Sequence, residues 1–183
     1  MIKPNQGKLL VKLARESISS YFLKDEPDTS SVKRFSQRQG VFVTLYKNNQ
    51  LRGCIGFPEP VFPLFEAIIK SARSAAFEDP RFPPLQKEEL KDIKIEISVL
   101  TVPKLIEVKK PEDYFKEIKI GKDGLIIRSS LGSGLLLPQV ATEYNWDAKE
   151  FLEHLCEKAW LKQDSWKDTN NRIYKFQAQI FRE

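Results

Sequence analysis

The stretch that most constrains this chain is Leu51–Gly56, which has the sequence LRGCIG and closes a segment typical of a β-hairpin. The run before it, Val41–Tyr46, is rich in β-branched and aromatic residues, which favour strands. Between the two runs stands Asn48-Asn49, and asparagine tolerates the left-handed backbone that a two-residue hairpin turn requires. The sequence therefore predicts two antiparallel strands joined at this turn.

The position of the turn also predicts how the two strands pair. If Lys47 faces Gln50, then counting back from the turn places Val43 opposite Cys54. Because side chains alternate along a strand, Arg52 and Cys54 are expected on the same face. A cation two residues from a thiol on one face would lower the pKa of that thiol and stabilise the thiolate.

Cys54 therefore has two interpretations. In the first it is a nucleophile, and Gly53 and Gly56 leave room for a ligand or another backbone to approach. In the second it is a small buried hydrophobic residue, and the glycines mark a bulge in the strand. The sequence leaves both open.

Polar residues in later segments are candidates for a ligand site with Arg52 and Gly53. A stiff turn, Pro58-Glu59-Pro60, follows the hairpin and fixes one carboxylate. Rigid loops and strand faces position the other candidates, which are Asp79, Arg81, Glu96 and Gln139. The alternatives are a structural ion pair between Asp79 and Arg81, and a solvated strand face at Glu96.

The remaining periodicity predicts a mixture of helices and strands without strict alternation. Helical spacing is found in residues 8–23, 61–77 and 147–160, and alternation in 93–99 and 172–181. Apolar runs at 125–128 and 134–137 predict a second hairpin. This pattern predicts an α+β fold, with a mostly antiparallel sheet flanked by helices. The length predicts a single domain over 1–183, or one domain with a lobe.

Composition excludes several classes of protein. The 183 residues carry a net charge of +5, from 30 basic and 25 acidic residues spread along the chain, which permits nucleic-acid binding but does not argue for it, so nucleic acid is not an expected partner. One His and two distant cysteines, Cys54 and Cys156, form no metal-binding pattern, so no metal, cofactor or disulfide is predicted. No leader or membrane-spanning run is recognisable, and a cytoplasmic location is expected.

Five short motifs occur in one order along the chain: LRGCIG, EP, DPRFPPL, IEISVL and GLLLPQVA. In this the sequence resembles the AMMECR-domain family from about Lys8 to the C-terminus. The resemblance implies a larger lobe built from both termini, a smaller inserted lobe and a cleft near the LRGCIG strand. It also implies a modification pathway shared with Memo-like and radical-SAM proteins, but it names no reaction.

Three functions are compatible with these observations. The first is an enzyme, or an enzyme component, in which Cys54 attacks a small anionic ligand held by Arg52 and the polar candidates. The only histidine, His154, is far away in sequence, so a Glu would have to act as the base. The second is a nucleic-acid or nucleotide binding module, and the third is a regulatory protein-interaction domain without catalysis.

Overall fold

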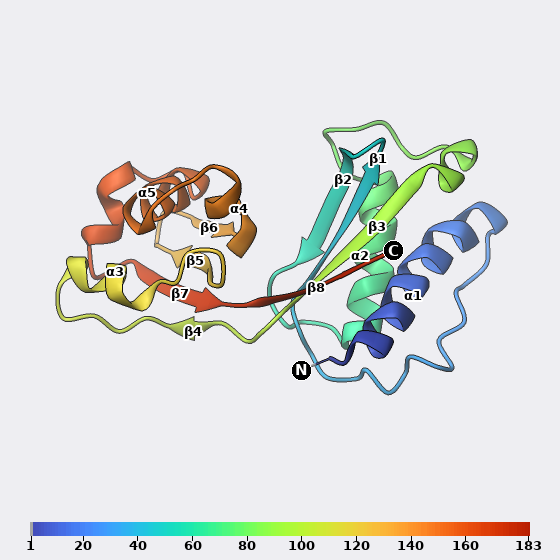
Figure 1. Ribbon diagram of the computed structural model, residues 1–183, viewed down its shortest axis with the longest axis horizontal. Coiled ribbons are helices and arrows are strands. Elements are labelled where there is room, and N and C mark those ends of the chain that lie inside the picture. The colour runs from blue at the N-terminus through green and yellow to red at the C-terminus, as the bar shows by residue number, and fades with distance from the viewer. Residues whose placement is uncertain (1) are drawn as a thin grey trace. The chain divides into compact units, whose positions relative to one another are not determined.

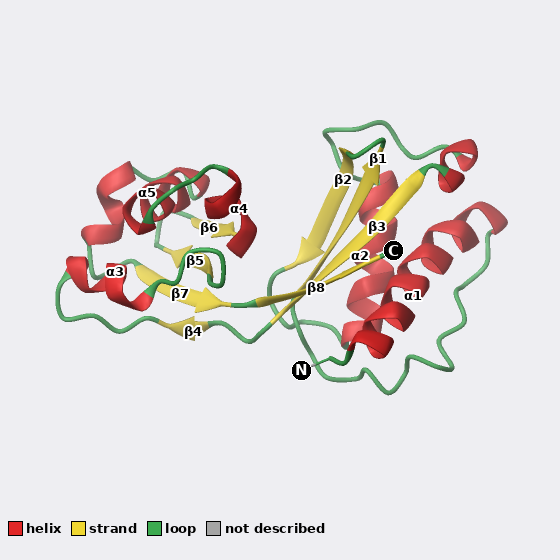
Figure 2. Ribbon diagram, in the orientation of Figure 1, coloured by secondary structure: helices red, strands yellow, loops and turns green. Residues whose placement is uncertain are grey.

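The computed structural model describes residues 2–183, which form two compact units (Figures 1 and 2). Unit 1 comprises Met1–Leu100 and Gln179–Glu183, and unit 2 comprises Thr101–Ala178. Each unit contains helices and one four-stranded sheet of antiparallel strands. The predicted α+β fold is confirmed.

The sheet of unit 1 has the strand order β2-β1-β3-β8. Its strands are β1 (Val41–Lys47), β2 (Gln50–Phe57), β3 (Ile93–Leu100) and β8 (Ala178–Arg182). Two long helices, α1 (Pro4–Leu23) and α2 (Leu64–Phe77), lie on one side of the sheet, as Figure 1 shows. A short 3-10 helix, η1 (Lys87–Lys91), connects α2 to β3.

Alternation along the strands explains which side the helices cover. Val43 and Leu45 of β1 and Ile95 and Ile97 of β3 are fully or almost fully buried, in one core with the apolar stripes of α1 and α2. Thr44, between Val43 and Leu45, therefore points to the opposite face. The turn before β2 is the predicted one, with φ of 53° at Asn48 and 61° at Asn49.

Unit 2 has its own sheet, of order β4-β7-β5-β6, and its own core. Its strands are β4 (Lys104–Leu105), β5 (Gly124–Arg128), β6 (Ser133–Leu136) and β7 (Arg172–Phe176). Its helical segments are η2 (Pro111–Asp113), α3 (Tyr114–Glu117), α4 (Pro138–Glu143), α5 (Ala148–Lys158) and η3 (Gln163–Lys167). The predicted capping box of α5 is confirmed by reciprocal hydrogen bonds between Asp147 and Glu150.

The alternating run at the C-terminus differs from the single strand expected over 172–181. It forms two strands, β7 in the sheet of unit 2 and β8 in the sheet of unit 1. Gln177 separates them, and its backbone N–H donates to Thr101 Oγ1 at 2.9 Å. Its carbonyl accepts from the Thr101 N–H at 2.8 Å. Because the hydrogen bonds of Gln177 go to Thr101, the ladder is broken where the chain passes between the units.

Candidate functional site

Cys54 lies on β2, the edge strand of the unit 1 sheet, and a β-bulge sets its register. The residues before and after Arg52 pair with successive residues of β1, so Arg52 is an extra residue on β2. The predicted pairing of Cys54 with Val43 is therefore wrong. Cys54 pairs with Thr44 instead.

The bulge also separates Arg52 from Cys54. Arg52 donates from Nε and Nη2 to the two carboxylate oxygens of Glu89, at 3.1 and 2.9 Å. Lys47, which alternation places on the side of α1 and α2, donates to the same carboxylate at 2.9 Å. Arg52 thus points to the helix side, while Cys54 contacts Thr44 on the other side. The expectation that Arg52 and Cys54 share a face is wrong, because a bulge interrupts alternation.

The positive charge of Arg52 is paired with the carboxylate of Glu89. The side chains of Arg52 and Glu89 are only 11% and 16% exposed. The hydrogen bonds from Arg52 are the main cause that lowers the pKa of Glu89 to about 2. Arg52 and Glu89 therefore form a largely buried ion pair that joins β2 to η1.

Asp79 and Arg81, in the loop after α2, hold the backbone of Cys54. The Cys54 N–H donates to Asp79 Oδ2 at 2.9 Å, and Arg81 Nη2 donates to the Cys54 carbonyl at 3.2 Å. Arg81 also donates to both carboxylate oxygens of Asp79, at 3.0 and 2.7 Å. The pair satisfies backbone groups on the outer side of β2, the edge strand of the sheet. Asp79 and Arg81 therefore form the ion pair that the sequence allowed, and they also lie beside Cys54.

The thiol of Cys54 belongs to a row of side chains that crosses the sheet. Thr44 Oγ1 donates to Cys54 Sγ at 3.2 Å, and Thr44 pairs with Glu96 on β3. Arg182 of β8 donates from Nε to Glu96 Oε2 at 2.6 Å. We call this row, Cys54, Thr44, Glu96 and Arg182, the polar face. Glu96 is only 4% exposed, so the expectation that this face of β3 is solvated at Glu96 is wrong.

Burial dominates the ionisation of the Cys54 thiol. Burial raises its pKa above the ordinary 9.0, and the carboxylates of Asp79 and Glu96 raise it further. The Thr44 hydrogen bond and the charge of Arg81 act in the opposite direction. At neutral pH the thiol is therefore protonated, which corrects the expectation of a thiolate stabilised by Arg52.

A cavity of about 330 Å³ adjoins Glu96. Its lining residues all belong to unit 1 and are Tyr46, Asn49, Lys94, Ile95, Glu96, Arg182 and Glu183. Two of them, Lys94 and Arg182, are cations, and two, Glu96 and Glu183, are carboxylates. Glu96 is the only residue of the predicted set among them, and Cys54 lies across Thr44 from Glu96.

Three further predicted ligand residues, besides Arg52, do not belong to the polar face. Gly53 faces α2, where a Cβ atom would stand 2.1 Å from the Ala75 carbonyl oxygen. Glu59 is exposed in the turn after β2. Gln139 belongs to α4 of unit 2, where its Oε1 is buried without a hydrogen-bond partner among the described residues.

Thr44, Lys94 and Arg182 were not predicted as site residues. Alternation does place Lys94 beside Glu96 on one face of β3, so that signal was available in the sequence. Thr44 depended on the bulge, which shifted the pairing of β2 by one residue. Arg182 depended on a pairing between β3 and the last strand of the chain, which no local pattern indicates.

Residues 2–183 contain neither a metal-binding cluster nor a membrane-spanning helix. No group of three or more His, Cys, Asp or Glu side chains in that range is arranged to hold a metal ion. Within the same range no helix combines the length and the apolar character needed to cross a membrane. Cys54 and Cys156 are both free thiols, and Cys156 is fully buried in unit 2.

Comparisons with known proteins place this chain among archaeal relatives. It is 53% identical to a protein of Methanothermobacter thermautotrophicus, over 98% of this chain and 95% of the relative. It is 48% identical to Protein TK0174 of Thermococcus kodakarensis, over 100% of this chain and 92% of the relative. The crystal structure of Uncharacterized Protein PH0010 from Pyrococcus horikoshii matches it with a TM-score of 0.92 at 47% identity, covering 100% of this chain and 93% of that one.

These relatives carry names without an activity, so they identify the kind of protein and leave its reaction open. The family described as AMMECR1 matches residues 11–181, which is nearly the whole sequence and includes both units. The chain therefore belongs to the AMMECR1 family.

Proposed function

We propose that the polar face is the reaction surface of an enzyme, or of an enzyme component, that acts on a small anionic ligand through the Cys54 thiol. The observation that carries the proposal is the row of reactive groups across three strands. The thiol accepts a hydrogen bond from Thr44, and the buried carboxylate of Glu96 stands on the next strand. A thiol, a hydroxyl and a carboxylate that lie in a row across the sheet can act as a nucleophile, a proton relay and a proton acceptor.

The proposed step begins from the protonated thiol, because burial raises the pKa of Cys54. The Thr44 hydroxyl, which stands between the two groups, takes up the thiol proton as it gives its own proton to the Glu96 carboxylate, and it then donates a hydrogen bond to the thiolate. Sulfur then bonds to an acyl carbon of the ligand, and the bond from that carbon to its leaving group breaks. The leaving group departs with the proton from Glu96, so atoms and charge balance.

Three cations would hold the negative charge of the ligand. Lys94 and Arg182 line the cavity beside Glu96. Arg81 lies against the Cys54 carbonyl, and its side chain is 54% exposed. Since an exposed guanidinium offers several donors in one plane, it suits a carboxylate or a phosphate.

The anionic preference is tested by alkylating the folded protein with iodoacetate and with iodoacetamide. The two reagents attack the same sulfur, and only iodoacetate is charged. We expect the ratio of the rates at Cys54, iodoacetate to iodoacetamide, to fall several-fold in Arg81→Ala and in Arg182→Ala, since each removes a nearby cation. Lys70→Ala, on α2 across the sheet, is the matched control and leaves the ratio unchanged. Arg52→Met should also leave it unchanged, because Arg52 points to the other side.

Cys156 serves as an internal reference in the same experiment. It is fully buried, and burial raises its pKa to about 11, so mass spectrometry should find Cys54 labelled first. The reaction itself is tested with acetyl phosphate, a small anionic acyl donor. We expect one acetyl group on Cys54, formed more slowly in Glu96→Gln. Two results would contradict the proposal. One is that none of the three reagents modifies Cys54, and the other is that the ratio of rates is unchanged in Arg81→Ala and Arg182→Ala.

A further inference from the structure

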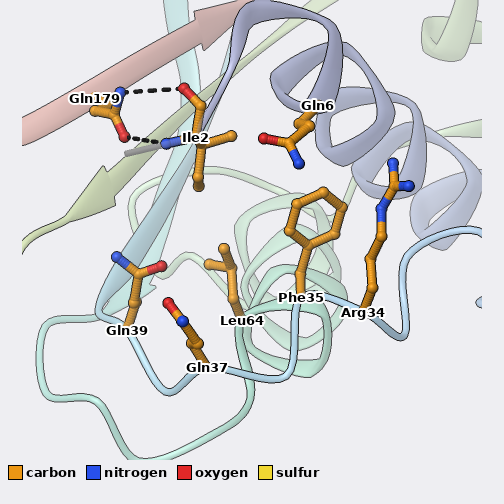
Figure 3. Close-up of a pocket in the computed structure, with 8 residues that line it drawn as sticks. All are labelled: Ile2, Gln6, Arg34, Phe35, Gln37, Gln39, Leu64 and Gln179. Atoms are coloured by element: carbon orange, nitrogen blue, oxygen red, sulfur yellow. Dashed lines mark hydrogen bonds between the residues drawn. The ribbon is translucent and has the colours of Figure 1, made fainter.

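A second cavity of unit 1 lies away from the polar face, on the side of the sheet that carries α1 and α2. Its volume is about 270 Å³, and Figure 3 shows the side chains around it. The lining residues come from the N-terminal segment, the loop before β1, the start of α2 and β8. They are Ile2, Gln6, Arg34, Phe35, Gln37, Gln39, Leu64 and Gln179.

Glutamine is concentrated in this cavity. The chain has nine glutamines, and four of the eight lining residues are among them. No lining residue is acidic. A glutamine amide offers both hydrogen-bond donors and acceptors without a net charge. The lining therefore suits an uncharged, planar group that has donors and acceptors along its edge.

Part of this hydrogen-bonding capacity holds the cavity together. Gln179 joins the backbone of Ile2 through two hydrogen bonds, at 2.9 and 3.3 Å, as drawn in Figure 3. Gln6 Oε1 accepts from the Lys3 N–H at 2.9 Å. Gln39 Nε2 donates to the Leu100 carbonyl at 3.3 Å. These contacts fix the side chains, so the cavity is built in advance of any ligand.

The rest of the capacity is not used within the protein. Gln37 is exposed and its side-chain amide makes no hydrogen bond within residues 2–183, and Figure 3 shows it turned toward Gln39. The amino group of Gln6 and Oε1 of Gln39 likewise have no partner in that range. The free groups thus include both donors and acceptors.

An aromatic ring and a cation complete the lining. The ring of Phe35 is partly buried against the unit 1 core, which holds it in place. The guanidinium of Arg34 lies over this ring, with its carbon 5.2 Å from the ring centroid. Arg34 is exposed and has no carboxylate partner within residues 2–183. A ring beside an unpaired guanidinium can stack a heterocycle and bind an anion attached to it.

From these observations we infer that this cavity binds a nucleoside monophosphate. The base stacks on Phe35, the amides of Gln37 and Gln39 bind its edge, and Arg34 binds the phosphate. Adenine is the best-matched base, because a glutamine amide can pair with its N6 donor and N7 acceptor together. The cavity volume of about 270 Å³ lies just below the usual range for ligand pockets, about 300–1,000 Å³, and therefore favours one nucleotide over a dinucleotide. This site is independent of the proposed reaction at Cys54.

The test is calorimetric titration of the full chain with AMP, adenosine and inorganic phosphate. We expect AMP to bind more tightly than either of its parts. Arg34→Ala should weaken AMP about tenfold, the effect of losing a charge-assisted hydrogen bond, and should leave adenosine unchanged. Gln37→Leu should weaken AMP and adenosine alike.

Two matched variants control for charge and composition. Lys33→Ala removes the same charge one residue away from Arg34, outside the lining, and Gln50→Leu makes the same exchange in an exposed strand position. Both should bind AMP as the natural chain does. Binding of AMP that is unaffected by Arg34→Ala and Gln37→Leu would overturn the inference, as would the absence of binding at about 5 mM AMP, a concentration that detects millimolar affinities.

Discussion

Asp79 shows how much a single side chain contributes to the surroundings of Cys54. Its carboxylate is only 2% exposed and accepts from the Cys54 N–H, from the Arg81 N–H and from the Arg81 guanidinium. Arg81 is the main cause that lowers the pKa of Asp79 from 3.8 to about 2. The carboxylate therefore stabilises the native state in its charged form.

The sign of the resulting pH dependence follows from that shift. Because the pKa in the folded chain is below the value in the unfolded chain, the contribution of Asp79 is complete above about pH 4 and is lost as pH falls through about 2. Asp79→Asn should lower the free energy of unfolding at pH 7 by about 1–2 kcal/mol, after allowance for the exposure of Arg81.

Urea unfolding of both proteins at pH 7 and near pH 2 measures this difference. The difference in the free energy of unfolding between the natural chain and Asp79→Asn should be smaller at the lower pH. Asp92→Asn, at an exposed position after η1, is the control and should change little. A gap that is as wide at low pH as at neutral pH would show that the Asp79 carboxylate does not act through its charge.

At the scale of elements, the bulge in β2 decides how the LRGCIG stretch is used. Gly53 follows the extra residue and faces α2, so the strand and the helix come into close contact. The Ala75 carbonyl oxygen would stand 2.1 Å from any Cβ at this position. The glycine is thus required by packing between β2 and α2.

Gly53→Ala should therefore destabilise the chain by about 2 kcal/mol or more, because a backbone atom of a packed helix cannot move aside cheaply. Thermal unfolding monitored by circular dichroism measures the loss. The comparison is Ser129→Ala, a loop substitution in unit 2 that should have only a small effect. If Gly53→Ala melted within a degree or two of the natural chain, the close packing of β2 on α2 would be wrong.

At the scale of the whole molecule, each unit has a sheet and a core of its own. The core of unit 2 includes Leu125, Ile127, Phe151 and Leu155, all fully buried. The two ends of this unit are held together, since Thr101 and Gln177 exchange hydrogen bonds through N–H, carbonyl and hydroxyl groups. A segment whose ends meet and whose core is internal has the properties of an independent folding unit.

The fragment 101–178 should accordingly fold when it is expressed alone. We expect dispersed amide resonances and slow hydrogen exchange at the strands β5 and β7, which pair with each other along their full length. Leu155→Ala in the fragment removes a fully buried side chain and should abolish this protection. A fragment with the spectrum of an unfolded chain would mean that unit 2 depends on the rest of the protein.

Local patterns in the sequence determined the elements of this protein, because the forces that set them act over a few residues. The tolerance of asparagine for positive φ angles made the turn between β1 and β2 predictable. The spacing of Asp147 and Glu150 likewise made the start of α5 predictable. Alternation gave the inward isoleucines of β3, and five motifs gave the family. The closeness of Asp79 and Arg81 to Cys54 was among the possibilities that the sequence raised.

The tertiary structure alone decided which groups surround the thiol. A one-residue bulge turned Arg52 toward Glu89 and brought Thr44 to Cys54. The glycines of the stretch allowed a bulge, but no local pattern determined that Arg52 would be the extra residue. Glu96 accepts a hydrogen bond from Arg182, which lies 86 residues further along the sequence. Burial then raised the pKa of Cys54, where its neighbours in sequence suggested the opposite. Such contacts depend on register and packing over the whole sheet, which no local pattern determines.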